Sequence, residues 1–387
     1  MDNLKLLSIY LPQFHPIPEN DKAWGEGFTE WTNVKKSKPL FDGHYQPHVP
    51  HSSIGYYDLE DPNTLVEQAK LAREYGIYGF AYYHYWFNGK RLLNLPIDNM
   101  LSQKKPDFPF CLIWANENWT KRWDGKDEEV IMKQDYSLED DKEHMEFLCN
   151  NVFNDERYIC VDDKPVFIIY KTELFPDIKK TVDVWRKTAK EHGFKDLYLV
   201  RVESISRTDP SSIEFDAAME FAPDWNSVQP STEHQNLKSR DYALTVFNML
   251  LKKYDYKVYR SVFPGWDNTA RRGENATIFL GANNDIFEYF LKCTIQNTLK
   301  LNKNEQFLFV NAWNEWAEGC HLEPDEKNGF KTLDIIKRLT SNKESVQLYN
   351  QYLNALERAE KVKSSNSYKL GNAILNPFSR IKKILNG

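Results

Sequence analysis

The sequence is poor in cysteine and contains no motif that would pair its cysteines. Five are scattered through 387 residues without a Cys-x-x-Cys, so neither a disulfide framework nor a cysteine-based zinc site is indicated. Long apolar runs are also missing, and no stretch of about 18 apolar residues predicts a membrane-spanning helix. Because the first residues lack the basic and apolar regions of a secretory signal, we predict a cytoplasmic protein.

A surplus of positive charge and the common nucleotide motifs are absent as well. The net charge of −6 argues against a nucleic-acid-binding protein, which would carry a basic excess. No Gly-x-Gly-x-x-Gly follows a predicted strand, so the nucleotide-binding form of an open sheet lacks its signature. No Asp-x-Asp occurs, although one class of sugar-nucleotide transferases uses that motif to bind metal. The nearest stretch, residues 139–141, is more simply the solvated start of a helix.

Apolar segments of strand-like composition alternate with helix-like segments through most of the chain. We predict strands at residues 6–11, 77–86, 110–114, 166–170, 197–202, 217–221, 257–263 and 307–313. We predict helices at residues 63–75, 97–102, 138–153, 182–191, 242–253, 286–299 and 346–359. Strands separated by helices in this number favour an α/β fold, a (β/α)8 TIM barrel, and a doubly wound open sheet is the alternative.

Most of the predicted strands run into polar or aromatic residues at their C-terminal ends. A barrel gathers these ends at one face, where the active sites of TIM-barrel enzymes lie. The aromatic content of 14% includes 11 tryptophans, and their grouping in polar strings favours surfaces that stack on sugar rings over a merely well-filled core. We predict substrate-binding residues at Gln13, His15, His84, Tyr85, Trp86, Asn116, Glu117, Asn118, Trp119, Glu203, Trp313 and Asn314.

The segment 21–53 is long, rich in Trp, His and Pro, and shows little periodicity. We expect a loop insertion that folds over the barrel mouth, because long loops in compact domains are usually functional. Within it, His44 and Tyr45 complete the predicted substrate-binding set. His44, His48 and His51 invite a metal site, but zinc needs three or four converging ligands with supporting partners. We prefer hydrogen bonds to sugar hydroxyls, and we predict no metal and no cofactor.

A basic segment begins at residue 361 and contains six Lys or Arg residues and no acidic one. Its apolar residues recur at helical spacing, interrupted by Pro377. We therefore divide the chain into a catalytic domain, residues 1–360, and a basic amphipathic tail, residues 361–387. Such a tail can lie on an anionic membrane surface, and peripheral membrane contact is one interpretation. A disordered or weakly packed basic tail is the alternative.

The stretch 307–324, FLFVNAWNEWAEGCHLEP, begins as a buried strand and turns into carboxylates, amides and indoles. Glu315 and Glu318 are our candidate catalytic acid and base, because glycosidic-bond cleavage commonly uses two carboxyl groups. On a regular strand they would point to opposite faces, so they converge only if the strand breaks at residues 314–317. Two surface glutamates on an ordinary loop are the other interpretation. Competing carboxylates, which the sequence alone does not rank, are Glu26, Glu30, Glu117, Glu203 and Glu220.

Several motifs together resemble a known family. They are LPQFHPIPEN, WGEGFTEWTNV, HYQPHVP, YGFAYYHYWF, IWANENWTKRWDG, and WNEWAEG followed by LEPD, and they span residues 4–325. They are similar to the glycoside hydrolase family 99 endo-α-mannosidases. The similarity is closer still to bacterial WbsX-like proteins, which are often labelled glycosyltransferases of surface-polysaccharide biosynthesis.

The resemblance implies a retaining mechanism. Glu315 would remove the proton of the substrate's 2-hydroxyl and yield a 1,2-anhydro sugar, while Glu318 would serve as general acid and then as general base. Ala317 and Cys320 depart from the mannosidase pattern. This departure puts the mannosidase specificity in doubt, but not the acid and base roles.

We therefore predict an enzyme that acts on α-linked, mannose-like glycans in bacterial surface-polysaccharide metabolism, with an oligosaccharide or a lipid-linked glycan as substrate. A glycosyltransferase or transglycosylase of O-antigen or capsule assembly is the alternative, and a lipid-linked donor would reconcile the two. An inactive carbohydrate-binding barrel is the alternative of another class, and the presence of both glutamates argues against it.

Overall fold

The computed structural model describes residues 3–121, 126–204, 207–234, 236–341 and 358. The chain divides into two units, Met1–Arg338 and Leu339–Gly387, and the fold given below is that of the first. The predicted tail 361–387 lies outside the described residues, as does the predicted helix 346–359 apart from residue 358. Among the helices of the described part, none is long and apolar enough to cross a membrane.

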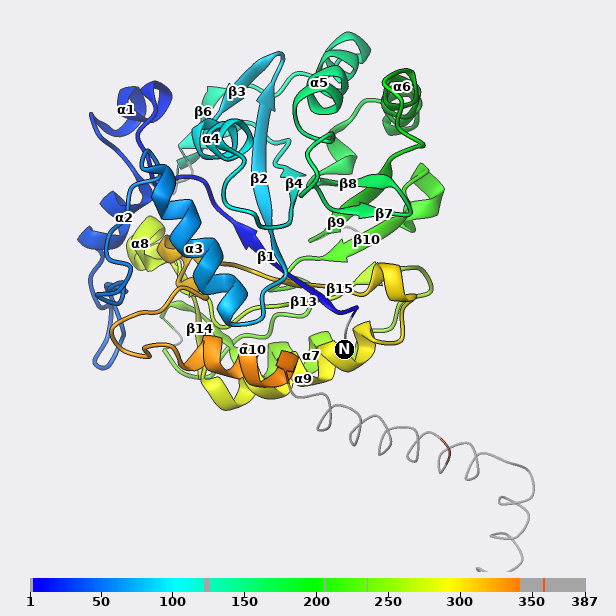
Figure 1. Ribbon diagram of the computed structural model, residues 1–387. Helices are drawn as coiled ribbons and strands as arrows, with labels where there is room; N and C mark the ends of the chain where they lie inside the picture. Colours follow the sequence, from blue (N-terminus) through cyan, green and yellow to red (C-terminus); the bar gives the residue numbers. More distant parts are fainter. Residues whose placement is uncertain (1–2, 122–125, 205–206, 235, 342–357, 359–387) are drawn as a thin grey trace, which may run out of the picture. The chain divides into compact units, whose positions relative to one another are not determined.

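A parallel β-barrel forms the centre of the first unit (Figure 1). Its strands are β1 (Lys5–Tyr10), β2 (Gly79–Phe87), β4 (Phe110–Trp114), β8 (Lys164–Ile169), β9 (Tyr198–Glu203), β10 (Ala217–Glu220), β12 (Val258–Tyr259), β13 (Ser261–Val262) and β15 (Phe307–Val310). Neighbours pair in parallel in chain order, and β15 returns to pair with β1. Because β12 pairs with β10, β13 pairs with β15, and only Arg260 separates them, one interrupted strand completes the ring. The predicted TIM barrel is confirmed, and every predicted strand overlaps an observed one.

Helices follow most of the barrel strands and cover the outside of the sheet (Figure 1). They are α3 (Pro62–Glu74), α4 (Leu95–Gln103), α5 (Leu138–Asn151), α6 (Ile178–Glu191), α7 (Tyr242–Leu251), α9 (Asn284–Thr298) and α10 (Lys331–Ser341). Several begin where a side-chain oxygen accepts a hydrogen bond from the first turn, which satisfies a backbone N–H that lacks a helical partner. These capping residues are Asp61, Ser137, Asp177, Asp241 and Asn283. Helix α10 was not predicted from the sequence.

Large aromatic side chains fill the layer between the sheet and the helices. The Tyr10 hydroxyl donates to Gln68 of α3 at 2.6 Å, and the Phe80 ring lies 5.2 Å from that of Tyr10. On the other side of the barrel, Trp114 of β4 packs against Trp185 of α6, with ring centroids 6.1 Å apart. Many of the aromatic residues therefore pack the interior of the fold, whereas the sequence pattern favours sugar-stacking surfaces.

The insertion 21–53 contains regular structure that the sequence pattern did not indicate. Short helices α1 (Pro18–Trp24) and α2 (Glu30–Lys36) lie within or overlap it, and Thr29 forms a capping box with Thr32 at the start of α2. Helix α2 packs against the segment that follows β15, where the Trp31 and Trp316 rings are 5.5 Å apart. The insertion therefore covers the C-terminal end of β15, as expected of a segment at the barrel mouth.

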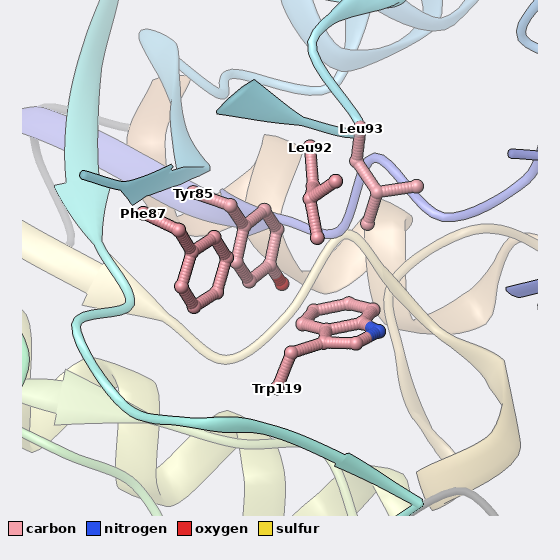
Figure 2. Close-up of a cluster of buried hydrophobic side chains, with 5 residues drawn as sticks. All are labelled: Tyr85, Phe87, Leu92, Leu93 and Trp119. Carbon is pink, nitrogen blue, oxygen red and sulfur yellow. The ribbon is translucent and has the colours of Figure 1, made fainter. Parts of the chain in front are cut away.

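Smaller elements extend the strand ends. They are β3 (Lys90–Leu92), β5 (Trp119–Lys121), β6 (Lys126–Met132), β7 (Cys160–Val161), β11 (Lys238–Asp241), β14 (Thr277–Leu280), α8 (Thr269–Arg272) and the 3-10 turns Thr172–Leu174, Pro210–Ile213, Gly273–Asn275 and Lys303–Glu305. β3 folds back antiparallel on the end of β2. Figure 2 shows the apolar cluster that this arrangement creates from Tyr85, Phe87, Leu92, Leu93 and Trp119. The cluster fixes Trp119 beside Tyr85, with ring centroids 5.0 Å apart in an edge-on arrangement.

Candidate active site

The segment after β15 breaks at the place that convergence of the two candidate glutamates requires. β16 (Asn314–Glu315) and β17 (Cys320–His321) form a short antiparallel hairpin, and a 3-10 turn over Trp316–Glu318 connects them. Residues three apart lie on one side of a 3-10 helix, so Glu315, just before the turn, and Glu318, at its end, can face the same way. Gly319 follows with φ 56°, and a Cβ there would lie 3.0 Å from the Cβ of Asp267. Only glycine fits this position without strain.

Both glutamates bind one arginine. Arg271 of α8 donates from Nη2 to Glu315 Oε2 at 2.8 Å and from Nη1 to Glu318 Oε1. The same Nη2 lies 2.8 Å from Oε2 of Glu30 on α2. Three carboxylates thus surround one guanidinium, with Glu30, Glu315 and Arg271 buried and Glu318 partly exposed. If all were ionised the cluster would carry a net charge of about −2, which is costly in a buried site.

The pKa values of the cluster reflect this crowding. Burial raises the pKa of Glu315 to about 8, with further upward shifts from Glu318 and Glu30, while Arg271 opposes the change. Burial likewise raises the pKa of Glu30 against the opposing charge of Arg271. Burial alone would lower the pKa of Arg271, but Glu30, Glu318 and Glu315 outweigh it and the pKa is raised. The site therefore holds a carboxyl group that exchanges its proton close to neutral pH.

Both glutamates open into a cavity of about 420 Å³ at the C-terminal ends of the barrel strands. Glu117, Asn118 and Trp119 from the connection after β4 line it, together with Tyr85 of β2. Of the predicted site residues, these four and the glutamate pair are the ones that the structure brings together. Lining residues that the sequence did not single out include Tyr83, Tyr170, Trp225, Trp266, Arg271 and Arg272.

Comparison with known proteins shows the family of the chain. The model of the family described as "Glycosyltransferase WbsX" matches residues 6–336. The chain belongs to the WbsX family. Protein WxcX of Xanthomonas campestris pv. campestris, strain B100, is 40% identical over 342 residues, which is 86% of this chain and 49% of that protein. The chain thus spans about half the length of the curated relatives it matches.

Solved structures share the fold of this WbsX family member. The endo-α-mannosidase of glycoside hydrolase family 99 from Bacteroides thetaiotaomicron has a TM-score of 0.57 and 15% identity over 89% of this chain and 98% of its own. A protein described as glycoside hydrolase-like gives the same TM-score of 0.57, with 12% identity over 88% of this chain and 94% of its own. The family model thus assigns the chain to the WbsX family, and the solved structures show its fold.

His84 and Trp86 lie on the outer face of β2, away from the cavity. Successive side chains of a strand alternate between its faces, so when Tyr85 faces the cavity its two neighbours cannot. His84 Nε2 lies 2.8 Å from Nε2 of His144, and Trp86 donates to Asp140 at 2.8 Å, both on α5. Burial lowers the pKa of His84 to about 3. Contrary to the sequence-based expectation, these two residues join the barrel to α5 rather than lining the cavity.

Asn116 and Glu203 also lie outside the cavity. Their side chains hydrogen-bond to residues at the rim of the barrel. Asn116 donates to the carbonyl of Lys171 and accepts from its N–H, both at 2.8 Å, which ties the end of β4 to that of β8. Glu203 accepts hydrogen bonds from the Tyr256 hydroxyl at 2.9 and 3.0 Å. Both polar side chains are therefore bound to other groups of the protein.

The remaining predicted residues of the strand ends are buried and lie outside the cavity. The Asn314 amide binds both the N–H and the carbonyl of Leu11, at 2.8 and 3.0 Å, and so fixes the hairpin to the end of β1. Trp313 packs 5.2 Å from Phe80 in the aromatic layer. Gln13 and His15 are almost completely buried, and burial lowers the pKa of His15 to about 4.

His44 and Tyr45 line a second cavity, of about 400 Å³, beside the insertion. His44 Nε2 and Gln46 Nε2 lie 2.6 and 2.7 Å from Oδ2 of Asp267. Burial alone would raise the pKa of Asp267, but hydrogen bonds from His44, Thr269 and Gln46 hold it below its usual value. Because Asp267 stands four residues before Arg271, these bonds connect the insertion to the segment that carries the arginine. Trp266 lines both cavities.

Proposed function

We propose that this chain is a retaining enzyme for α-linked, mannose-like glycans, with Glu318 as general acid and base and Glu315 as the base for the substrate's 2-hydroxyl. One observation carries the proposal: both carboxylates leave the same break after β15, open into one cavity and share the guanidinium of Arg271. Two carboxyl groups at one cavity are what glycosidic-bond cleavage uses. The fold shared with an endo-α-mannosidase supports an α-mannose-like substrate.

The first step forms an anhydro sugar. Glu315 takes the proton of the 2-hydroxyl, and O2 attacks the anomeric carbon as the bond to the leaving oxygen breaks. Glu318 gives its proton to that oxygen. A carboxylate whose pKa is raised to about 8 is a stronger base once ionised, which suits removal of a hydroxyl proton.

The second step opens the anhydro ring. Glu318, now ionised, takes a proton from the incoming hydroxyl, whose oxygen attacks the anomeric carbon. The bond from that carbon to O2 breaks, and Glu315 returns the proton to O2. Each step inverts the anomeric centre, so the product retains the α configuration.

Transfer to a sugar acceptor is a second candidate, which the family's description as a glycosyltransferase favours. The same two carboxylates serve hydrolysis and transfer, because only the attacking hydroxyl differs. Two carboxylates that share one arginine and open into one cavity are what an enzyme of this kind needs, and they favour catalysis over binding alone.

Turnover of α-mannosyl fluoride and other α-glycosyl fluorides, with and without a sugar acceptor, tests the proposal on the full chain. Wild type, Glu318→Gln and the control Glu274→Gln are compared, because Glu274 is exposed beside α8 and does not line the cavity. Fluoride leaves without a proton, so Glu318→Gln should still form the intermediate but lose its turnover by water. Added azide needs no base, and it should restore turnover in Glu318→Gln as the α-glycosyl azide.

The outcomes separate the candidates. Free α-sugar from wild type without acceptor supports a hydrolase, and product only with acceptor supports a transferase. A β-configured product, or equal loss of activity in Glu274→Gln, contradicts the assigned mechanism. Glycan binding without turnover of any donor supports the inactive barrel instead.

A further inference from the structure

A second group of side chains converges outside the cavity of the two glutamates. His48, His321 and Asp325 each offer one ligand atom, and these atoms lie within 4.8 Å of one another. The closest pair is His48 Nδ1 and His321 Nε2, 2.9 Å apart. The three residues come from the insertion, from β17 and from the turn after it. His44 and His51, which stand near His48 in the sequence, do not join the group, because His44 binds Asp267 and the His51 imidazole binds Ser53.

The tautomer of His321 is set by its other ring nitrogen. Nδ1 of His321 lies 2.8 Å from the carbonyl oxygen of Glu323, which can only accept, so Nδ1 carries the proton. The Nε2 lone pair of His321 therefore points towards His48. The Trp316 ring stacks on His321 at 3.7 Å between centroids and fixes its plane. A histidine that donates one N–H to a carbonyl and presents its other nitrogen is the usual state of a metal ligand.

Asp325 is oriented in a similar way. The backbone N–H of Asn328 donates to one of its carboxylate oxygens, and the side-chain amide of Asn328 donates to the other at 2.9 Å. The backbone on either side is tied to the insertion, since Glu326 N–H donates to the Val49 carbonyl and His51 N–H to that of Pro324, each at 2.9 Å. Two backbone bonds thus hold the His48 and Asp325 segments in register.

The second cavity, of about 400 Å³, borders all three residues and gives access from solvent. Lys327 also lines it, and its ammonium lies 4.4 Å from the centre of the Tyr45 ring. That cation–π contact directs the positive charge towards the ring. The carboxylates of Asp325 and Asp267 add negative charge to the same cavity.

We propose that His48, His321 and Asp325 form a binding site for a divalent transition metal, with zinc the best match to two imidazoles and a carboxylate. Three protein ligands with a fourth position open to a cavity are a common arrangement for zinc. Zinc–nitrogen bonds of about 2.0–2.1 Å at tetrahedral angles place the two nitrogens roughly 3.3 Å apart. The rings therefore need to separate by about 0.4 Å from their 2.9 Å contact, which small rotations supply.

The position of the site suggests what the metal does. His321 follows Glu318 by three residues on the same hairpin, and Trp316, between the two glutamates, stacks on it. The metal would fasten the insertion to the hairpin that carries the candidate catalytic pair, and it touches no reacting atom. The proposal does not depend on the reaction assigned above.

Zinc content and zinc binding of the untagged full chain test the site. Wild type is compared with His48→Ala, Asp325→Asn and the control His51→Ala, which removes a nearby imidazole that hydrogen-bonds to Ser53 and leaves the backbone bonds of His51 in place. After chelation and dialysis, each protein is titrated with zinc against a chromophoric chelator, and thermal unfolding is recorded with and without zinc. Cobalt(II) substitution supplies a spectrum that reports the ligand geometry.

We expect one zinc per wild-type chain, a zinc-dependent rise in Tm, and intense visible cobalt bands typical of four-coordinate nitrogen and oxygen ligation. His48→Ala and Asp325→Asn should weaken zinc binding by at least about 100-fold, while His51→Ala should match wild type. Wild type that binds no zinc at micromolar concentration would overturn the proposal. The proposal would also be overturned if His51→Ala lost as much zinc affinity as the ligand variants, or if His48→Ala and Asp325→Asn kept the zinc affinity of wild type.

Discussion

The Nη2 atom of Arg271 lies 2.8 Å from Oε2 of Glu315, and its partner nitrogen binds Glu318. One planar guanidinium thus sets the relative position of the two candidate catalytic carboxylates. A lysine has a compact ammonium on a flexible stem and lacks the planar fork of donors that holds both carboxylates in fixed positions. The geometry of the pair therefore depends on arginine in particular.

Replacing this arginine by lysine should impair the reaction while a long cationic side chain still lines the cavity. We expect Arg271→Lys to lower kcat/KM by roughly 10- to 100-fold, because small displacements of catalytic groups have effects of that size. Arg271 also lowers the pKa of Glu315, so a weaker partner should move the ascending limb of the pH–rate profile to higher pH. Steady-state kinetics across pH measures both effects. An unchanged pH profile would show that Arg271 only packs.

The wild-type pH profile follows from the raised pKa of Glu315, which is about 8. The ionised form is the base, so kcat/KM should rise as the pH increases from 6 towards 8. Glu30 contributes to raising this pKa, so Glu30→Gln removes a negative charge and should shift the ascending limb to lower pH. Initial rates with a glycosyl fluoride record the limb. The exposed-site variant Glu274→Gln should leave the ascending limb at the same pH. A shift of the limb to higher pH in Glu30→Gln would contradict the assignment of Glu315 as the base.

Substitutions of two tryptophans should distinguish a residue that binds glycan in the cavity from one that packs the fold. Trp225 lines the cavity and is partly exposed, with its ring edge-on to Trp266 at 5.3 Å. We expect Trp225→Ala to weaken glycan binding by about tenfold, which corresponds to ~1.4 kcal/mol of lost contact. Trp86→Phe keeps an aromatic ring against α5 and should lower stability while leaving glycan affinity unchanged. Calorimetric titration with mannose oligosaccharides measures the glycan affinity of both variants. A larger loss of affinity in Trp86→Phe than in Trp225→Ala would support the predicted substrate-binding role of Trp86.

The strands of the barrel were predictable because each is a short apolar run that ends in polar residues. The break after β15 was also foreseeable, since Glu315 and Glu318 could converge only through it. The sequence indicated neither α10 nor the two short helices of the insertion. In α2, the capping box of Thr29 and Thr32 lacks the Glu or Gln that usually marks the motif.

The side chains at the strand ends were harder to predict than the strands. The sequence pattern predicts that His84, Tyr85 and Trp86 all bind substrate, although alternation along a strand allows only one face to reach the cavity. Arg271 carries no local signal, because its role depends on Glu30, which stands 241 residues away in the chain. When charged residues far apart in the chain come into contact only in the folded structure, the sequence around each of them does not show which ones belong to the site.

The anchoring of the insertion by Asp267 yields a last prediction. Asp267 accepts hydrogen bonds from Gln46 and Thr269 and pairs with His44, all in a buried setting. Asp267→Ala leaves these donors without their acceptor, so we expect the free energy of unfolding to fall by about 3–5 kcal/mol. Asp267→Asn keeps one acceptor oxygen and should cost about 1–3 kcal/mol.

Urea unfolding followed by tryptophan fluorescence measures these differences. Asp42→Asn, an exposed change in the same insertion, is the matched control and should stay within about 0.5 kcal/mol of wild type. Since Asp267 precedes Arg271 by four residues, both Asp267 variants should also lose activity in the order of their lost stability. A stable Asp267→Ala with full activity would mean that the insertion is held by its other contacts, such as the packing of α2 against the hairpin, and that Asp267 is dispensable.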